Sequence, residues 1–246
     1  MSTLSGNNHM LALRPRTTAD PALRRRFGSG LGIYRRGGDE ADLCESSEPN
    51  TAMGVALPFP CHHRDEALPQ TEHATLLDWL EQREPWRDAD GGFYRTLVFG
   101  LERDADVPDA LKAHFSPDNP AWAEQLASTL FQTPLTLRGP IALHQMARGH
   151  GVGIHSDEPA PGEETHRIVI TCCRPCAPDA GGHFILLSGD QPRDARVVVP
   201  LRSNALLAFG LERRSHHAIT SIRSSVRYSV VMSFRRAAAI PPEGAR

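Results

Sequence analysis

The feature that limits the fold most is a series of short apolar segments separated by turn residues, which begins near Leu135. The intervening residues are rich in Gly, Pro and Asp, which favour tight turns. The segments predict strands near residues 135–147, 152–157, 166–173, 182–187, 195–200, 204–209, 215–222 and 226–235. About eight short antiparallel strands are typical of a jelly roll. We therefore predict a mainly β fold: a double-stranded β-helix core of jelly-roll or cupin-like form, with flanking helices.

Helix and strand patterns also precede this region. An apolar stripe over residues 71–84 predicts an amphipathic helix that Pro85 ends. Asn119 followed by Pro120 predicts the start of a second helix, with Asn119 as N-cap and Pro120 in the first turn. Residues 93–99 alternate in polarity like a strand. We expect the helices to cover one face of the β core.

These patterns divide the chain into four expected regions. Residues 1–70 form a partly irregular N-terminal arm or lid, and the Pro-rich residues 51–70 predict a loop. Residues 71–134 form a helical support region with a strand, residues 135–236 the β-helix core, and residues 237–246 a tail. Two roles stay open for the Arg- and Gly-rich start of the arm: a loosely packed segment, or a lid or subunit contact.

A candidate metal-binding pair lies at His155 and Asp157. On a strand, residues i and i+2 point to the same face, so this imidazole and this carboxylate would face inward together. A third ligand has two neighbouring candidates, His216 and His217, of which only one can face inward from a strand. We prefer His217. Two imidazoles and one carboxylate form the triad that holds non-haem Fe(II) and leaves coordination positions open.

A candidate anion site follows on the last predicted strand. The alternation over residues 226–234 puts Arg227 and Ser229 on one face and the larger apolar side chains on the other. A guanidinium can donate two hydrogen bonds to one carboxylate, and a neighbouring hydroxyl can donate one more. Arg227 and Ser229 therefore predict a carboxylate-binding pair.

Taken in order, these residues resemble a known group of enzymes. His155-x-Asp157, a gap of 59 residues before His217, and then Arg227-x-Ser229 ten residues on are similar to the Fe(II)/2-oxoglutarate-dependent dioxygenase superfamily, in its prolyl 4-hydroxylase-like branch. Further landmarks of the resemblance are Gly149, Gly181-Gly182-His183-Phe184, Pro200, Asn204 and Phe209. The chain departs from the family at Met146, where a tyrosine often contacts the cosubstrate.

The resemblance implies Fe(II), with 2-oxoglutarate as cosubstrate and O2 as oxidant. It implies His155, Asp157 and His217 as catalytic metal ligands, and as cofactor-binding residues Arg227, Ser229, His144 and Gln145. The implied reaction is oxidation of an unactivated C–H bond, by default hydroxylation, with succinate and CO2 as coproducts. Desaturation and cyclisation stay open. Further side chains expected near the pocket, each with a structural alternative, are Arg148, His150 and Arg167.

Three functions follow from this interpretation. We expect an enzyme that acts on a small molecule such as an amino acid or a biosynthetic intermediate. One alternative is a hydroxylase of a peptide or protein side chain. A second alternative is a non-catalytic jelly-roll binding protein, which the intact set of triad, Arg227 and Ser229 disfavours.

Charge and composition limit the classes of binding partner and the compartment that we expect. A net charge of −2 gives no reason to expect a nucleic acid or an anionic membrane as partner. No window approaches about 18 consecutive apolar residues, and the N-terminus lacks a signal-peptide pattern, so we expect a cytoplasmic protein. The five cysteines include a cluster at Cys172, Cys173 and Cys176. We interpret these as reduced, buried thiols; a zinc site with His166 or His183 is the alternative.

Overall fold

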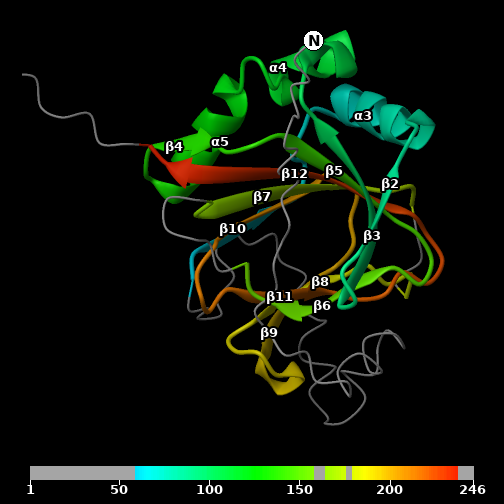
Figure 1. Ribbon diagram of the computed structural model, residues 1–246, viewed down its shortest axis with the longest axis vertical. Helices are drawn as coiled ribbons and strands as arrows, with labels where there is room; N and C mark the ends of the chain where they lie inside the picture. Colours follow the sequence, from blue (N-terminus) through cyan, green and yellow to red (C-terminus); the bar gives the residue numbers. More distant parts are fainter. Residues whose placement is uncertain (1–58, 158–163, 176–178, 238–246) are drawn as a thin grey trace, which may run out of the picture.

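The computed structural model describes residues 59–157, 164–175 and 179–237. Most of the expected arm, nearly all of the expected tail, and Cys176 lie outside these ranges. The described chain is mainly β: its strands form one strongly curled antiparallel sheet, with the helices gathered on one side of it (Figure 1). This arrangement confirms the predicted jelly-roll core with flanking helices.

The strands are β1 (Cys61–Arg64), β2 (Arg87–Asp90), β3 (Tyr94–Leu101), β4 (Leu135–Leu137), β5 (Ile141–Met146), β6 (Gly151–His155), β7 (His166–Cys172), β8 (Phe184–Leu187), β9 (Ala195–Val199), β10 (Ala205–Gly210), β11 (His216–Ile219) and β12 (Arg227–Arg236). The described helices are α3 (Gln70–Gln82), α4 (Lys112–Phe115) and α5 (Ala121–Phe131), and short 3-10 turns are η1 (Asp104–Asp106), η2 (Asp109–Leu111) and η3 (Pro192–Asp194). None of these helices combines the length and the apolar composition that a membrane span requires.

The curled sheet consists of two layers that face each other. Strands β1, β10, β7, β12, β5 and β3 follow one another in the larger layer, and β6, β11, β8 and β9 continue the same path as the smaller layer. Strand β2 pairs with β3, and β4 pairs with β12. In Figure 1 the helices lie above the larger layer and the smaller layer lies below it. The space between the layers is therefore closed on both sides by strands.

Alternation along the strands sorts the core into separate clusters. On β12, Tyr228, Val230, Met232 and Phe234 share one face, as the sequence predicted, and that face packs against the helices. Side chains of the opposite parity fill the space between the layers, where β7 and β10 meet β8 and β9; the buried members of this inner cluster are Phe59, Val169, Phe184, Leu186, Val199, Leu207, Phe209 and Leu211. Polar residues on the inner face of these strands are thus enclosed by apolar side chains.

Several predicted strands have other bounds in the structure. The predicted strand 135–147 is two strands, because Gly139 takes a φ of +75° between β4 and β5. The predicted strand 152–157 stops at His155, so Asp157 lies beyond β6. The assumption that His155 and Asp157 share a strand face was therefore wrong, although both side chains still face the inner space.

Two short strands were not predicted. Strand β1 lies in the expected loop 51–70 and adds to β10, and the charged strand β2 pairs with β3. Neither has an apolar alternation that would mark it in the sequence. Strand β1 is stabilised by pairing with the distant β10, and β2 by its hairpin with β3. The Asn204 amide joins the segment after β1 to the sheet, because it accepts from Leu68 N at 2.9 Å and donates to Leu68 O at 2.8 Å.

The predicted start of the second helix was off by one residue. Pro120, and not Asn119, occupies the N-cap position of α5, and no side chain caps that helix end.

Candidate metal centre

Two histidines meet because their strands are paired. His155 on β6 lies directly opposite His217 on β11 in an antiparallel pair, which puts both side chains on the same face. The two rings have centroids 4.2 Å apart. His216 pairs with Leu187, whose side chain belongs to a cluster on the outer face of the smaller layer. The preference for His217 over His216 therefore agrees with the structure.

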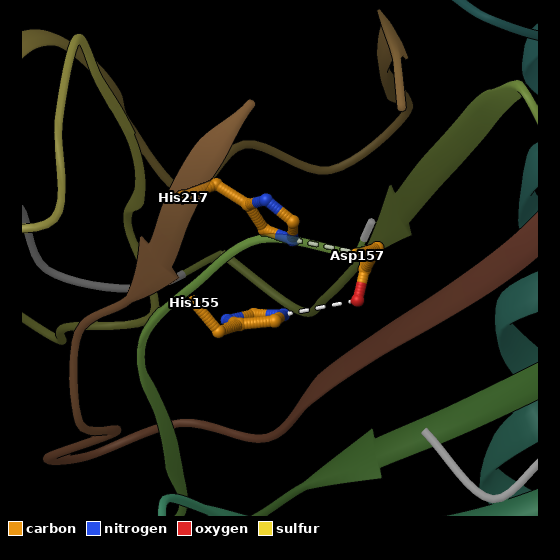
Figure 2. A group of neighbouring side chains, drawn as sticks. All are labelled: His155, Asp157 and His217. Atoms are coloured by element: carbon orange, nitrogen blue, oxygen red, sulfur yellow. Dashed lines mark ion pairs between the residues drawn. The ribbon is translucent and has the colours of Figure 1, made fainter. Parts of the chain in front are cut away.

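Asp157 completes a group of three from just beyond the end of β6. Its Oδ1 lies 3.5 Å from His155 Nε2, and its Oδ2 lies 3.4 Å from His217 Nε2. The ligand atoms of the three residues all lie within 4.8 Å of one another (Figure 2). Among the described residues this is the one group with such geometry. Two imidazole nitrogens and a carboxylate around one point match the donor set of non-haem iron.

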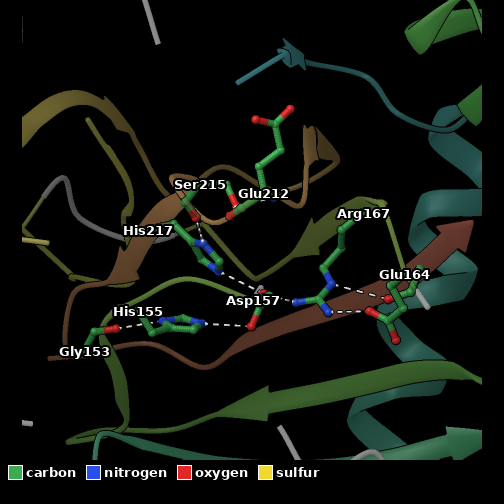
Figure 3. A network of polar contacts seen from close by, with 9 residues as sticks. Gly153, His155, Asp157, Glu164, Arg167, Glu212, Ser215 and His217 are labelled. Carbon is green, nitrogen blue, oxygen red and sulfur yellow. Dashed lines mark hydrogen bonds and ion pairs between the residues drawn. The ribbon is translucent and has the colours of Figure 1, made fainter. Parts of the chain in front are cut away.

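The second nitrogen of each imidazole is held by the backbone. His155 Nδ1 lies 2.9 Å from Gly153 O, and His217 Nδ1 lies 3.0 Å from Ser215 O (Figure 3). A carbonyl only accepts, so each Nδ1 carries the proton and each Nε2 presents a lone pair to the centre. Backbone carbonyls in this role orient metal-binding histidines in proteins. The residues present therefore fit a divalent metal.

The surroundings of His217 and Asp157 hold these two residues in the protonation states that a metal needs. Burial lowers the pKa of His217 to about 3, with a further lowering from His155, so this imidazole is neutral near pH 7. Burial alone would raise the pKa of Asp157, but the nearby Arg167 guanidinium holds it well below its ordinary value. Asp157 is therefore an anion in the folded protein.

A carboxylate–guanidinium network supports Asp157 from the larger layer. Arg167 on β7 donates from Nη1 to Asp157 Oδ2, and from Nη2 to Glu164 Oε2 at 2.7 Å (Figure 3). Its Nε donates to Ser233 Oγ on β12 at 3.3 Å. Arg167 was predicted only as a residue near the pocket. Its contact with Asp157 depends on how β7 faces the end of β6, which local sequence does not reveal.

Arg227 is a buried cation on the inner face of β12. It is 3% exposed and makes no ion pair within the described part of the chain. Its Nη2 donates to Thr171 Oγ1 at 3.3 Å, and its Nη1 lies 3.6 Å from Met146 Sδ. Its Nε has no hydrogen-bond partner, and neither has the buried hydroxyl of Ser229. Burial lowers the pKa of Arg227 to about 10, which leaves it charged near pH 7. Unsatisfied donors beside a buried positive charge fit a carboxylate ligand.

A pocket lies beside Arg227 between the layers. Thr171, Gly182 and Phe184 line it together with Arg227. Phe184 also stacks on the His217 ring, with centroids 5.3 Å apart, and so connects the pocket wall to the triad. A Cβ at Gly182, which has a φ of +75°, would lie 3.4 Å from the Arg227 side chain and 2.5 Å from Ile222. Glycine at this position leaves room for the guanidinium.

The consecutive residues His144, Gln145 and Met146 on β5 point alternately to the two faces of the sheet. His144 is the cross-strand partner of Ser229, so it shares the inner face, and burial lowers its pKa to about 4 with a further lowering from Arg227. The amide of Gln145, which was also predicted to bind the cosubstrate, turns to the helix side and donates to the Tyr228 hydroxyl at 3.2 Å. Met146 takes an inward position against Arg227. Thr171, which was not predicted, supplies a hydroxyl next to the Arg227 guanidinium.

The remaining predicted residues lie away from the triad. Arg148 is exposed, and His150 is buried in the turn between β5 and β6. Cys172 and Cys173 are both buried, and burial raises the pKa of the Cys172 thiol well above its ordinary range.

Comparison with solved structures gives proteins of one fold. The chain is similar to a prolyl-4-hydroxylase from Pseudomonas putida, with a TM-score of 0.58 and 16% identity over 74% of this chain and 95% of that one. It is similar to SnoN, a non-heme alpha-ketoglutarate-dependent epimerase from nogalamycin biosynthesis, with a TM-score of 0.54 and 15% identity over 92% and 93%. It is also similar to SnoK, a carbocyclase of the same biosynthesis, with a TM-score of 0.53 and 18% identity over 77% and 87%.

No protein-family profile matches the chain, and no curated protein sequence matches it. The likeness therefore rests on structure, and at these identities it concerns the fold. The resemblance predicted from His155, Asp157, His217 and Arg227 is confirmed at that level. The chain has the double-stranded β-helix fold of the 2OG-Fe(II) oxygenases, prolyl-4-hydroxylases included.

Proposed function

We propose that the protein is a non-haem Fe(II)/2-oxoglutarate-dependent dioxygenase that oxidises an unactivated C–H bond of a small molecule. The observation that carries the proposal is the convergence of His155 Nε2, His217 Nε2 and the Asp157 carboxylate within 4.8 Å. These three side chains would hold the metal. Bound Fe(II) and 2-oxoglutarate would supply the activation of O2, with succinate and CO2 as coproducts.

The protein's own groups would hold the cosubstrate at its far end. Arg227 and Ser229 have unsatisfied donors in a buried site, and the Thr171 hydroxyl lies beside the guanidinium. Together they would bind the carboxylate of 2-oxoglutarate that does not chelate the metal. The apolar inner cluster around them excludes water, and a low dielectric strengthens such charge-assisted bonds.

The substrate class is the finer part of the proposal. Similarity to SnoN extends over 92% of this chain, and both SnoN and SnoK are named for nogalamycin biosynthesis, which favours a small biosynthetic intermediate. Similarity to a prolyl-4-hydroxylase favours the alternative of a peptide side chain. A screen of succinate release against amino acids, short peptides and polycyclic intermediates distinguishes the two. Turnover of peptides alone would contradict the small-molecule proposal.

The first test of the proposal is spectroscopic. Protein prepared without oxygen and loaded with Fe(II) and 2-oxoglutarate should show the weak visible metal-to-ligand charge-transfer band of the chelated cosubstrate. His155→Ala should abolish the band. His216→Ala is the matched control, because this neighbouring imidazole lies on the outer face, and it should keep the band. A wild-type protein without the band, or a His155→Ala variant that retains it, would favour a non-catalytic binding protein instead.

A further inference from the structure

All three nitrogens of the Arg167 side chain are engaged. Nη1 binds Asp157 Oδ2 and Nη2 binds Glu164 Oε2 (Figure 3). Nε binds Ser233 Oγ. The side chain is only 12% exposed. A planar guanidinium with contacts in three directions can adopt one orientation. Arg167 is therefore a rigid support that reaches from the larger layer to the metal-binding carboxylate.

The two oxygens of Asp157 have different surroundings. Each oxygen lies near one imidazole, Oδ1 at 3.5 Å from His155 Nε2 and Oδ2 at 3.4 Å from His217 Nε2. Only Oδ2 also accepts a charge-assisted hydrogen bond from Arg167, so Oδ1 is the oxygen that is not already engaged. Carboxylates bind metals through one oxygen or through both. Ligation through both oxygens would occupy one of the open positions that the triad otherwise leaves for small molecules.

We propose that Arg167, held by Glu164 and Ser233, is a positioning residue that engages Asp157 Oδ2 so that Asp157 ligates the metal through Oδ1 alone. The proposal rests on the metal centre proposed above. Its physical basis is that a charge-assisted hydrogen bond restricts the carboxylate in a site of low dielectric. Partners that orient metal ligands in this way change metal affinity by about 10–100-fold when they are removed.

A single substitution would mix two effects, because Arg167 also carries a positive charge that opposes a bound cation. Arg167→Met removes both the charge and the contact. Combined with Glu164→Gln, it removes one positive and one negative charge, so the net charge of the network is unchanged. A change of metal binding in this double variant therefore reports the lost contact.

The experiment titrates Co(II) into metal-free protein without oxygen and follows the visible d–d absorption. The titration yields the Kd, and the intensity of the band reports the coordination of the metal. The double variant should raise the Kd by about 10–100-fold and change the band intensity. Arg174→Met is the matched control, because Arg174 binds the carboxylates of Asp78 and Glu81 at an exposed site. It should keep the wild-type Kd and band.

The outcomes separate this proposal from the proposed function. If wild-type protein binds no Co(II), the metal centre itself is refuted. If wild-type protein binds Co(II) and the folded double variant keeps its Kd and band, the role of Arg167 is refuted while the metal centre stands. If the double variant does not fold, Ser233→Ala removes only the Nε contact. A changed band in that variant supports the proposal, and an unchanged band contradicts it.

Discussion

At the scale of single residues, Arg227 has the least satisfied surroundings in the site. Its contacts among the described residues are a hydroxyl and a thioether, and its Nε is unsatisfied. A buried charge without a counter-ion costs folding free energy. The same features favour a carboxylate, which would supply both the charge and the missing acceptors. We therefore expect Arg227 to lower the stability of the ligand-free protein and to strengthen the binding of a carboxylate ligand.

Arg227→Met should weaken 2-oxoglutarate binding and leave the unfolding midpoint unchanged or higher. Loss of a hydrogen bond to a charged group costs about 1.5–3 kcal/mol, which raises the Kd by about 10–100-fold. Titration of the charge-transfer band measures the Kd, and thermal unfolding measures the midpoint. Ser229→Ala is the milder comparison, because it removes one neutral donor. A large drop in the midpoint of Arg227→Met, with 2-oxoglutarate binding intact, would show that Arg227 is structural.

Two histidines with a lowered pKa predict the acid sensitivity of the metal-free protein. The pKa of His144 is lowered to about 4 and that of His217 to about 3, while an unfolded histidine titrates near 6.5. The unfolded chain therefore binds more protons below that value, and stability falls as the pH drops from about 6.5 towards the folded pKa values.

At pH 5 each of these histidines should cost at most about 2 kcal/mol of stability relative to neutral pH. Urea unfolding of metal-free protein across this range measures the loss. In His144→Gln the free energy of unfolding should fall less steeply between neutral pH and pH 5. An equally steep fall in that variant would contradict the lowered pKa of His144.

At the scale of elements, the register of β6 against β11 decides which histidine faces inward. His155 lies opposite His217, and a slip of one residue would exchange His217 for His216. Backbone hydrogen bonds beyond the strand ends hold the register: Gly149 N donates to Ile222 O at 2.9 Å, and Ile222 N donates to His150 O at 2.9 Å. The shared direction of both imidazoles thus depends on strand pairing, not on the histidines alone.

Helix α3 provides the element-scale prediction. Its Leu80 is fully buried in the cluster between the helices and the larger layer, whereas the metal centre lies on the opposite face of that layer. Leu80→Ala should lower the free energy of unfolding by about 2–5 kcal/mol and keep the charge-transfer band of the folded fraction. The exposed Gln82→Ala should change stability by less than about 0.5 kcal/mol. Loss of the band in a folded Leu80→Ala protein would contradict this separation.

At the scale of the whole molecule, the candidate centre joins parts that are far apart in the chain. His155 and His217 come from the smaller layer, and Arg167 reaches Asp157 from the larger one. A metal bound to the triad would stabilise the folded state and not the unfolded chain, because only folding brings these groups together.

Co(II) or Mn(II) should therefore raise the thermal midpoint of metal-free protein. At a free metal concentration of about 100 Kd, the expected gain is about 2.7 kcal/mol. Calorimetry with and without metal measures it. His155→Ala should show no metal-dependent gain, and an equal gain in that variant would mean that the metal binds elsewhere.

The sequence determined those properties that depend on local backbone period. Alternation on residues 226–234 was sufficient to place Arg227 and Ser229 on one face of the strand and Tyr228 on the other. Turn residues marked most strand ends, and the adjacency of His216 and His217 allowed only one of them to face inward. Spacing between motifs carried the resemblance to the oxygenases, which the shared fold confirms.

Tertiary structure decided everything that depends on pairing between distant segments. Strand β1 exists because β10 offers an edge, and Asp157 meets His155 from outside the strand that was expected to hold both. The bond from Arg167 to Asp157 depends on the two layers facing each other. Parity along one strand gives the direction of a side chain, but its neighbour across the core follows only from the register and curl of the whole sheet.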